Sequence, residues 1–242
     1  MKNLLIPTTF QNDTLDALKT AIHYGNGASC TLVLLLVSDV QDNYSASSLL
    51  RSLDNKWTNA QEDILDKCRD LIAENTNCRL KVHNQFGVSS PLIKSLLELY
   101  QIEFVILPQS FKNSSLKIHQ YCSQILANYK CPILHINNSV EDIHFNNALY
   151  FENEKSNYPL ADMQQLVQER FSLKIVSQAK ISSQEANQEL IPMVTEAIAK
   201  NDIDIIIETR KAAKISINKR KNLLTDEALG LPVLSIYEEV YS

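Results

Sequence analysis

The chain has 242 residues, 45% of them hydrophobic and 21% charged, with a formal net charge of −5 at pH 7. This balance is typical of one large globular domain or two small ones, and it provides no overall basic field that would attract nucleic acid. Only four residues are glycine, so the sequence has neither a P-loop nor a G-x-G-x-x-G fingerprint, both of which need clustered glycines against phosphate.

The N-terminal apolar stretch is too short for a signal peptide, and no apolar run approaches the roughly 20 residues of a membrane span. We therefore expect a cytoplasmic protein without a membrane partner. Its five cysteines are expected to be reduced thiols that mostly fill the core.

The first half of the chain alternates strands and helices. Thr31–Val37 is continuously apolar, which is typical of a parallel strand buried on both faces. We predict strands at Asn3–Ile6, Thr31–Val37, Arg79–Phe86, Glu103–Leu107 and Pro132–Ile136, and helices at Asp13–His23, Leu49–Glu74, Ser90–Tyr100 and Ser115–Tyr129. Right-handed crossovers turn this alternation into a parallel sheet with helices on both faces.

A polar linker at Asn137–Asn147 precedes a second alternation. Its predicted strands are Ala148–Phe151, Leu173–Ser177, Asp204–Ile207 and Val233–Ile236, and its helices are Pro159–Phe171, Gln184–Lys200 and a segment near Ile217–Leu229. We expect two Rossmann-like α/β domains, a complete one at residues 1–138 and a shortened one with four strands at residues 145–242.

The two halves repeat in matching order. Cys131–Ile136 corresponds to Leu231–Ile236 at an offset of 100, and Ile102–Leu107 corresponds to Ile203–Glu208 at an offset of 101. The first strands, Asn3–Ile6 and Asn147–Tyr150, lie 144 positions apart. The second half therefore lacks a segment, which we assign to the third strand and the long helix before it.

Several segments of the first half resemble the universal stress protein family. These are Leu4-Leu5-Ile6-Pro7-Thr8-Thr9-Phe10, Gly87-Val88-Ser89-Ser90-Pro91-Leu92-Ile93, Glu103-Phe104-Val105-Ile106-Leu107 and Cys131-Pro132-Ile133-Leu134-His135-Ile136. The resemblance covers residues 1–137 and, more loosely, 146–238. It implies the adenine nucleotide alpha hydrolase-like fold, with strand order 3-2-1-4-5 in the first domain. Tandem members pair their two domains as a built-in dimer, which here would join the halves through the fifth strands.

The resemblance also locates a nucleotide site that this sequence has lost. Nucleotide-binding members use an aspartate after strand one, and glycines followed by glycine-serine after strand four. Here Thr9 replaces the aspartate, and the positions after strand four hold Pro108, Phe111, His119 and Gln120. Side chains there would crowd the phosphates, and proline has no amide donor. We therefore expect no ATP binding of the family's kind and no cofactor.

A basic cluster follows the predicted strand Asp204–Ile207, with no acidic residue from Thr209 to Thr225. Open α/β sheets hold ligands at this edge, so the cluster is a candidate anion site, the alternative being a solvated face. Lys219 and Arg220 fall near the position of the family's glycine-serine. The candidate anion-binding residues are Arg210, Lys211, Lys214, Lys219, Arg220 and Lys221.

A metal site and a hydrolytic site are weaker alternatives. His119, Cys122, Cys131 and His135 are all residue types that bind zinc, but their spacing matches no common zinc module, so we interpret them as core residues. No G-x-S-x-G elbow exposes a nucleophile.

We favour a non-enzymatic, stress-related regulatory or scaffolding protein that acts on an unknown protein partner and can form homo-oligomers. The alternatives are a protein that binds an adenine nucleotide or another anion and, third, a small hydrolase.

Overall fold

The computed structural model describes residues 2–39, 57–137, 145–153, 158–181, 187–212 and 229–238. Within these ranges the hydrogen-bonded strand order is β3-β2-β1-β4-β5-β9-β8-β6-β7. The strands are β1 (Lys2–Thr8), β2 (Cys30–Ser38), β3 (Cys78–Phe86), β4 (Phe104–Leu107), β5 (Ile133–His135), β6 (Asn147–Asn153), β7 (Lys174–Ile181), β8 (Ile205–Arg210) and β9 (Val233–Tyr237). The helices are α1 (Asp13–Gly25), α3 (Asn59–Ala73), α4 (Ser90–Leu99), α5 (Gln109–Lys112), α6 (Lys117–Ala127), α7 (Leu160–Phe171) and α8 (Asn187–Asn201). The α/β fold and the order 3-2-1-4-5 of the first half are confirmed.

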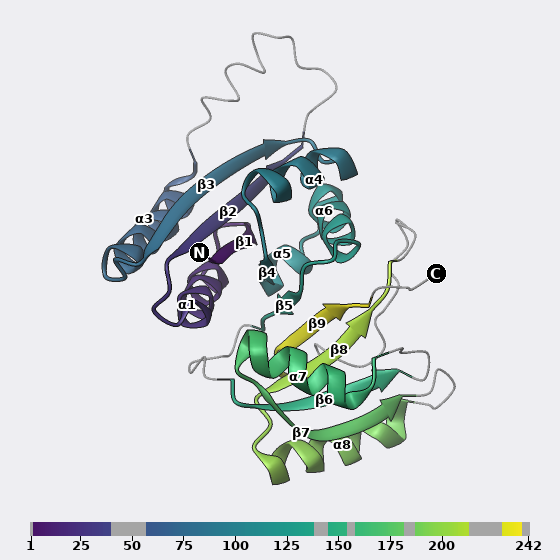
Figure 1. Ribbon diagram of the computed structural model, residues 1–242. Coiled ribbons are helices and arrows are strands. Elements are labelled where there is room, and N and C mark those ends of the chain that lie inside the picture. The colour runs from purple at the N-terminus through teal and green to yellow at the C-terminus, as the bar shows by residue number, and fades with distance from the viewer. Residues whose placement is uncertain are drawn as a thin grey trace. The chain divides into compact units, whose positions relative to one another are not determined.

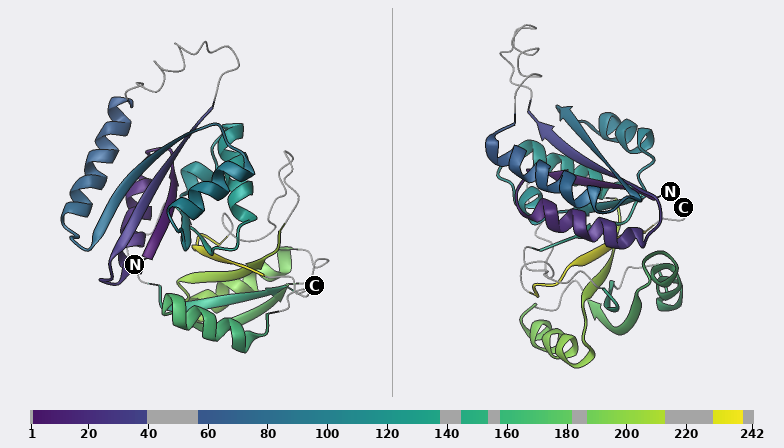
Figure 2. Two further views of the ribbon diagram at one scale, coloured as in Figure 1. Left: turned by 45° about the horizontal axis from the view of Figure 1, so that its top comes forward. Right: turned by 90° about the vertical axis from the view of Figure 1, so that its left-hand side faces the viewer.

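The chain divides into two compact units, which we describe separately. Unit 1 comprises Met1–Glu103 and Pro108–Leu126, and unit 2 comprises Phe104–Leu107 and Ala127–Ser242. In unit 1, β1 pairs with β2 and β2 with β3, all parallel. Helices α1 and α3 cover one face of these strands, and α4 and α6 lie on the other (Figures 1 and 2). A division into domains at residues 138 and 145 stays a prediction.

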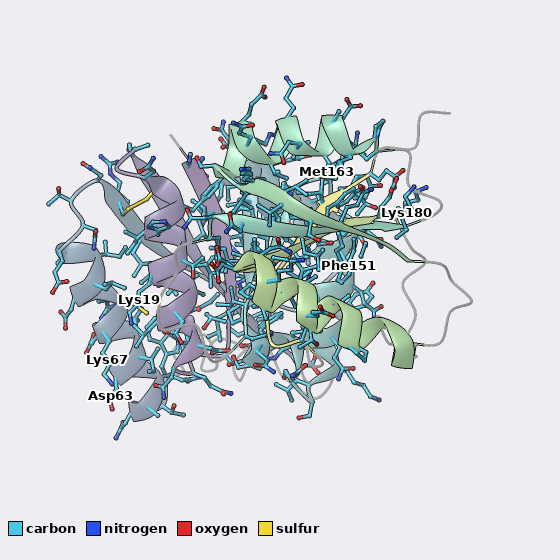
Figure 3. All side chains as sticks on the ribbon, turned by 90° about the horizontal axis from the view of Figure 1, so that it is seen from below. Lys19, Asp63, Lys67, Phe151, Met163 and Lys180 are labelled. Atoms are coloured by element: carbon cyan, nitrogen blue, oxygen red, sulfur yellow. A yellow bond between two sulfur atoms is a disulfide. The ribbon has the colours of Figure 1, made fainter. Side chains whose placement is uncertain are left out.

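Unit 2 contains the four strands expected of the second half. β6 pairs in parallel with β7 and β8, and β8 pairs in parallel with β9. Helix α7 covers one face and α8 the other, and Figure 3 shows Met163 of α7 and Phe151 of β6 on these opposite faces. Phe151 packs in a core with Val194 of α8 and Ile206 of β8. The shortened half is therefore a layered α/β structure of its own.

Some predicted element boundaries are wrong. The predicted helix from Leu49 starts at Asn59 within the described residues, because Thr58 and Gln61 form a capping box there. Residues 40–56 lie outside the described ranges, as does most of the predicted helix near 217–229. The turn of helix α5, directly after β4, was not predicted. Helix α4 begins at Ser90 as predicted, and the Ser89 side chain caps it by accepting from the Leu92 amide at 3.4 Å.

The same hydrogen bonds recur where the first and fourth strands of each half begin. The Asn3 amide donates to the Gln101 carbonyl at 3.3 Å, and the Asn147 amide donates to the Asp202 carbonyl at 3.2 Å. Gln101 and Asp202 both have left-handed backbones, with φ of 50° and 46°. Matching main-chain bonds of 2.9 Å run from Glu103 N to Asn3 O and from Asp204 N to Asn147 O. The repeat seen in the sequence therefore extends to its hydrogen bonds.

Strands β5 and β9 join the two halves of the chain in an antiparallel ladder. Leu134 pairs with Leu234, His135 with Val233 and Ile133 with Ser235. Ile133 and Val233 are both buried. Because the repeat offset here is 100, Leu134 pairs with its own counterpart, Leu234. The pairs Ile133–Ser235 and His135–Val233 are exchanged when the two halves are exchanged, so the ladder is symmetric about Leu134 and Leu234. Pairing of the halves through the fifth strands is confirmed.

Two of the five cysteines are not reduced thiols, which corrects the sequence-based expectation. Cys30 and Cys78 form a disulfide between β2 and β3, because parallel pairing places them directly opposite each other with Cα atoms 4.8 Å apart. Cys68 and Cys122 are buried free thiols, and burial raises their pKa values to about 11 and about 12. Among the described residues, no helix is long and apolar enough to cross a membrane.

Candidate functional site

The candidate nucleotide site of the first half lies where β1 ends and where the chain continues after Pro108. Asp13, at the start of α1, is almost fully buried. Its carboxylate accepts from the Ser110 amide at 2.7 Å and from the Ser110 hydroxyl at 2.8 Å. Since that hydroxyl donates to Asp13, Thr9 donates to Ser110 Oγ at 2.9 Å. Hydrogen bonds thus run from Thr9 to Ser110 and from Ser110 to Asp13.

The turn after β1 is held by a second set of polar contacts. The Phe10 amide donates to Thr8 Oγ1 at 2.8 Å, and the Thr8 and Thr14 hydroxyl groups lie 2.8 Å apart. Phe10 has a left-handed backbone, with φ of 54°, and its buried ring lies 5.4 Å from the ring of Trp57. Threonine at positions 8 and 14 therefore locks the β1–α1 turn in an uncommon backbone conformation.

Phe111 and His119, two of the positions expected to be degenerate in a nucleotide site, pack against each other. Phe111 is completely buried, and its ring stacks on the His119 imidazole with centroids 4.6 Å apart. His119 Nε2 lies 3.1 Å from the Val37 carbonyl, which can only accept, so Nε2 carries the hydrogen. Nδ1 then accepts from the Ser114 hydroxyl at 2.8 Å. Burial lowers the pKa of His119, which favours this neutral form.

The remaining groups of this segment are also engaged. Pro108 has no amide hydrogen, and the amides of Lys112 and Asn113 donate to the carbonyls of Pro108 and Gln109 at 3.1 and 2.8 Å. The Gln120 side chain donates to the Ser114 carbonyl at 3.0 Å. The Lys112 and Asn113 amides are therefore used within this helical turn, whereas a phosphate loop directs its amides at the ligand.

The basic cluster begins with two residues that make internal contacts. The Arg210 guanidinium donates to the carbonyls of Ala127 at 3.0 Å and Tyr129 at 2.9 Å, and also to those of Cys131 and Ser235. Burial lowers its pKa to about 10. Arg210 thus fastens the end of β8 to the segment between α6 and β5.

Lys211, the next residue, lies 3.4 Å from the buried carboxylate of Glu238. Lys214, Lys219, Arg220 and Lys221 lie outside the described residues. The anion site therefore stays a prediction, and the structure provides no contact that supports it.

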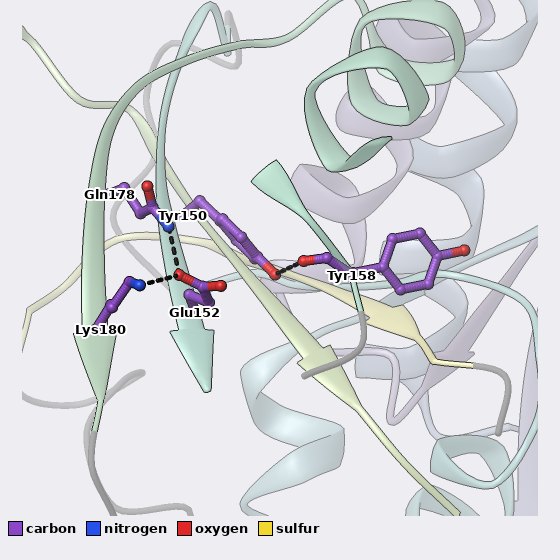
Figure 4. A network of polar contacts seen from close by, with 5 residues as sticks. All are labelled: Tyr150, Glu152, Tyr158, Gln178 and Lys180. Carbon is purple, nitrogen blue, oxygen red and sulfur yellow. Dashed lines mark hydrogen bonds and ion pairs between the residues drawn. The ribbon is translucent and has the colours of Figure 1, made fainter. Parts of the chain in front are cut away.

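The equivalent edge of the second half has different chemistry. Glu152, near the end of β6, accepts from Gln178 of β7 at 2.5 Å and lies 3.5 Å from the ammonium of Lys180 (Figure 4). The buried Tyr150 donates its hydroxyl to the Tyr158 carbonyl at 3.3 Å. The polar side chains of Glu152, Gln178 and Lys180 therefore pair with one another across β6 and β7.

The sequence analysis missed Asp13, Ser110 and Ser114. Each lies next to a predicted element, at a position where a polar residue is common as a cap or a turn former. Only the fold shows that Ser110 reaches Asp13, 97 positions away. Among the described residues, no group of three or more His, Cys, Asp or Glu side chains is arranged to hold a metal ion.

Comparison with solved structures identifies the same fold over nearly the whole chain. A universal stress protein from Archaeoglobus fulgidus aligns over 99% of this chain and 97% of its own length, with a TM-score of 0.55 and 12% identity. A protein of unknown function from Pseudomonas aeruginosa aligns over 98% of this chain and 93% of its own length, with a TM-score of 0.51 and 12% identity. No family model and no curated protein matches the sequence. The similarity is one of fold, of the tandem universal stress protein type.

Proposed function

We propose that this protein is a non-enzymatic regulatory or scaffolding module of the universal stress protein type that does not bind ATP. The full-length similarity of fold supports the type. The observation that carries the rest is the first half's nucleotide segment, where the completely buried Phe111 and its stacked partner His119 occupy the interior beside α5.

The proposal follows from the hydrogen-bond donors that a triphosphate requires. A phosphate group in this fold needs several main-chain N–H groups directed at it. Ser110, Lys112 and Asn113 donate their amides internally, and Pro108 has none. A phosphate oxygen left without its donor costs about 1–3 kcal/mol for each bond lost. The Asp13 carboxylate adds like-charge repulsion next to the same segment.

Such a module acts through its surface, so its ligands are other proteins or further copies of the chain. This role agrees with the hydrogen bonds that the described polar side chains of both strand-end regions make within the protein. A partner would recognise the folded shape rather than a nucleotide-dependent state.

Isothermal titration calorimetry with ATP and Mg²⁺ tests the proposal. We expect no saturable heat, and purified protein should show no excess absorbance at 260 nm. A dissociation constant below about 10 μM, equivalent to about 7 kcal/mol, would overturn the proposal. The variant F111A, checked for folding by circular dichroism, is the matched control. Binding gained by F111A alone would show that the Phe111 ring is what closes the site.

A further inference from the structure

The Cys30–Cys78 disulfide lies where β2 and β3 both begin. It joins residues 48 positions apart that face each other in the parallel register. Two hydrogen bonds accompany it, from the Cys30 amide to the Asn77 carbonyl and from the Asn77 side chain to the Gly27 carbonyl, both 3.0 Å. The disulfide and these two hydrogen bonds therefore hold β2 and β3 together where both strands begin.

The strand β3, which the disulfide holds on β2, is only partly buried. β3 is the last described strand on its side of the sheet, and none of its residues is fully buried. The preceding helix α3 buries only Ile64, Leu65 and Cys68 among its fifteen residues. β2, by contrast, is mostly buried and carries no charged residue. The attachment of β3 thus relies on the strand ladder and the disulfide more than on a hydrophobic core.

The second half shows how this protein forms a sheet edge where the described residues contain no third strand. β7, the counterpart of β2, is the last described strand on its side, and it has a register shift near Val176. The Ile175 amide donates to the Gln164 side chain of α7 at 2.8 Å, and Lys174 and Lys180 are exposed. Irregular pairing and lysines protect a strand edge from unwanted pairing. β2 has no such protection and depends on β3 to cover it.

The two cysteines of the disulfide differ in exposure. Cys30 is completely buried, whereas Cys78 is partly exposed, so we infer that an external thiolate attacks Cys78 rather than Cys30. Of the free cysteines, Cys68 and Cys122 are buried and Cys131 is partly exposed. This asymmetry defines a direction of attack.

We propose that Cys30 and Cys78 form a thiol–disulfide exchange site whose redox state sets how firmly β3 is held on β2. A thiolate of an external dithiol attacks Cys78 Sγ, and the sulfur–sulfur bond breaks to release Cys30 as a thiolate, which takes up a proton. The second thiol of the reagent then attacks the mixed disulfide and releases Cys78. The protein disulfide gains two electrons, and the dithiol becomes a cyclic disulfide. A disulfide oxidant such as oxidised glutathione reverses the exchange.

Thiol counting tests the chemistry. Denatured, untreated protein should take up three maleimide groups, and protein treated with dithiothreitol should take up five. Incubation of the native reduced protein with oxidised glutathione should return the count to three. The proposal would be wrong if the untreated protein already had five reactive thiols and if oxidised glutathione did not lower that number.

Hydrogen exchange measured by mass spectrometry tests the structural consequence. Amides of β3 should exchange at least tenfold faster in the reduced protein, whereas those of β8 should not change. The variant C30S/C78S should resemble the reduced state, and C131S should respond to dithiothreitol as the unmodified protein does. If the double variant does not fold, the reduced unmodified protein provides the same measurement. Equal exchange of the β3 amides in the two redox states would show that the disulfide does not set how firmly β3 is held on β2.

Discussion

The two halves of this chain agree at one end of their strands and differ at the other. Where the first and fourth strands begin, Asn3 and Asn147 make the same bond to a left-handed residue. Where strands end, Thr8 bonds within its own turn, whereas its counterpart Glu152 pairs with β7. Parallel α/β sheets hold ligands at the carboxyl ends of their strands. The two halves thus share the hydrogen bonds at the beginnings of these strands and differ in the polar contacts at their carboxyl ends.

Loss of Arg210 should have the largest effect on how the halves are joined. We expect R210A to lower the free energy of unfolding by about 3 kcal/mol, because four carbonyl groups lose a charged donor. R210K should have an intermediate effect, because an ammonium lacks the planar fork of the guanidinium. Urea unfolding measures both. R170A removes an exposed arginine of α7 and is the control. A loss for R210A no larger than that for R170A would contradict this role.

The hydrogen bonds at the carboxyl ends of the strands in the first half depend on Asp13. D13N should cost about 2 kcal/mol, because the carboxylate accepts two short bonds from Ser110 and an amide supplies only one acceptor oxygen. S110A keeps the main-chain bond and should cost about 1 kcal/mol. Thermal unfolding followed by circular dichroism ranks the two variants. The reverse order would show that the hydroxyl, rather than the carboxylate, organises this region.

His119 should make the first half sensitive to acid. Its pKa is lowered in the folded protein, so the unfolded chain binds the proton more readily once the pH falls below about 6.5. Stability should therefore fall with decreasing pH in that range, by up to about 1.4 kcal/mol per pH unit for one proton. H119Q should flatten the dependence of urea midpoints between pH 7 and pH 5. H23Q, which changes an exposed histidine of α1, should leave it intact.

The repeated asparagines provide the finest test of the comparison. N3A and N147A should each cost about 1 kcal/mol, because each loses a side-chain bond to the left-handed residue before the fourth strand. Differential scanning calorimetry of the two variants measures both losses. Costs that differ by more than a factor of three would show that the two junctions match in geometry but not in energy.

Periodicity and local chemistry predicted most of the fold. The uncharged run in β2 and the start of α4 at Ser90 are local signals, and both were interpreted correctly. The offset of the repeats predicted that the second half lacks the third strand and the long helix before it, and the described residues of that half contain neither. Helix α5 was not predicted, because four residues after a proline show no period of their own.

Much less of the candidate site was predictable. Thr9, Phe111 and His119 were identified as positions by resemblance, but the bonds between Thr9, Ser110 and Asp13 join residues about a hundred positions apart. The disulfide was missed for the same reason, because the pairing of Cys30 with Cys78 depends on the register of two strands.

The symmetric ladder of β5 and β9 has a consequence for how such a chain can change. In a pair of identical subunits joined through one strand, every substitution occurs twice, and a damaging change in one copy is matched by the same change in the other. Here Leu134 and Leu234 meet at the centre of the same arrangement within a single polypeptide. The tether keeps the local concentration of the partner strand high, so pairing does not depend on how much protein is present. The two halves are thus free to diverge, and among the described residues one has four strands and the other has five.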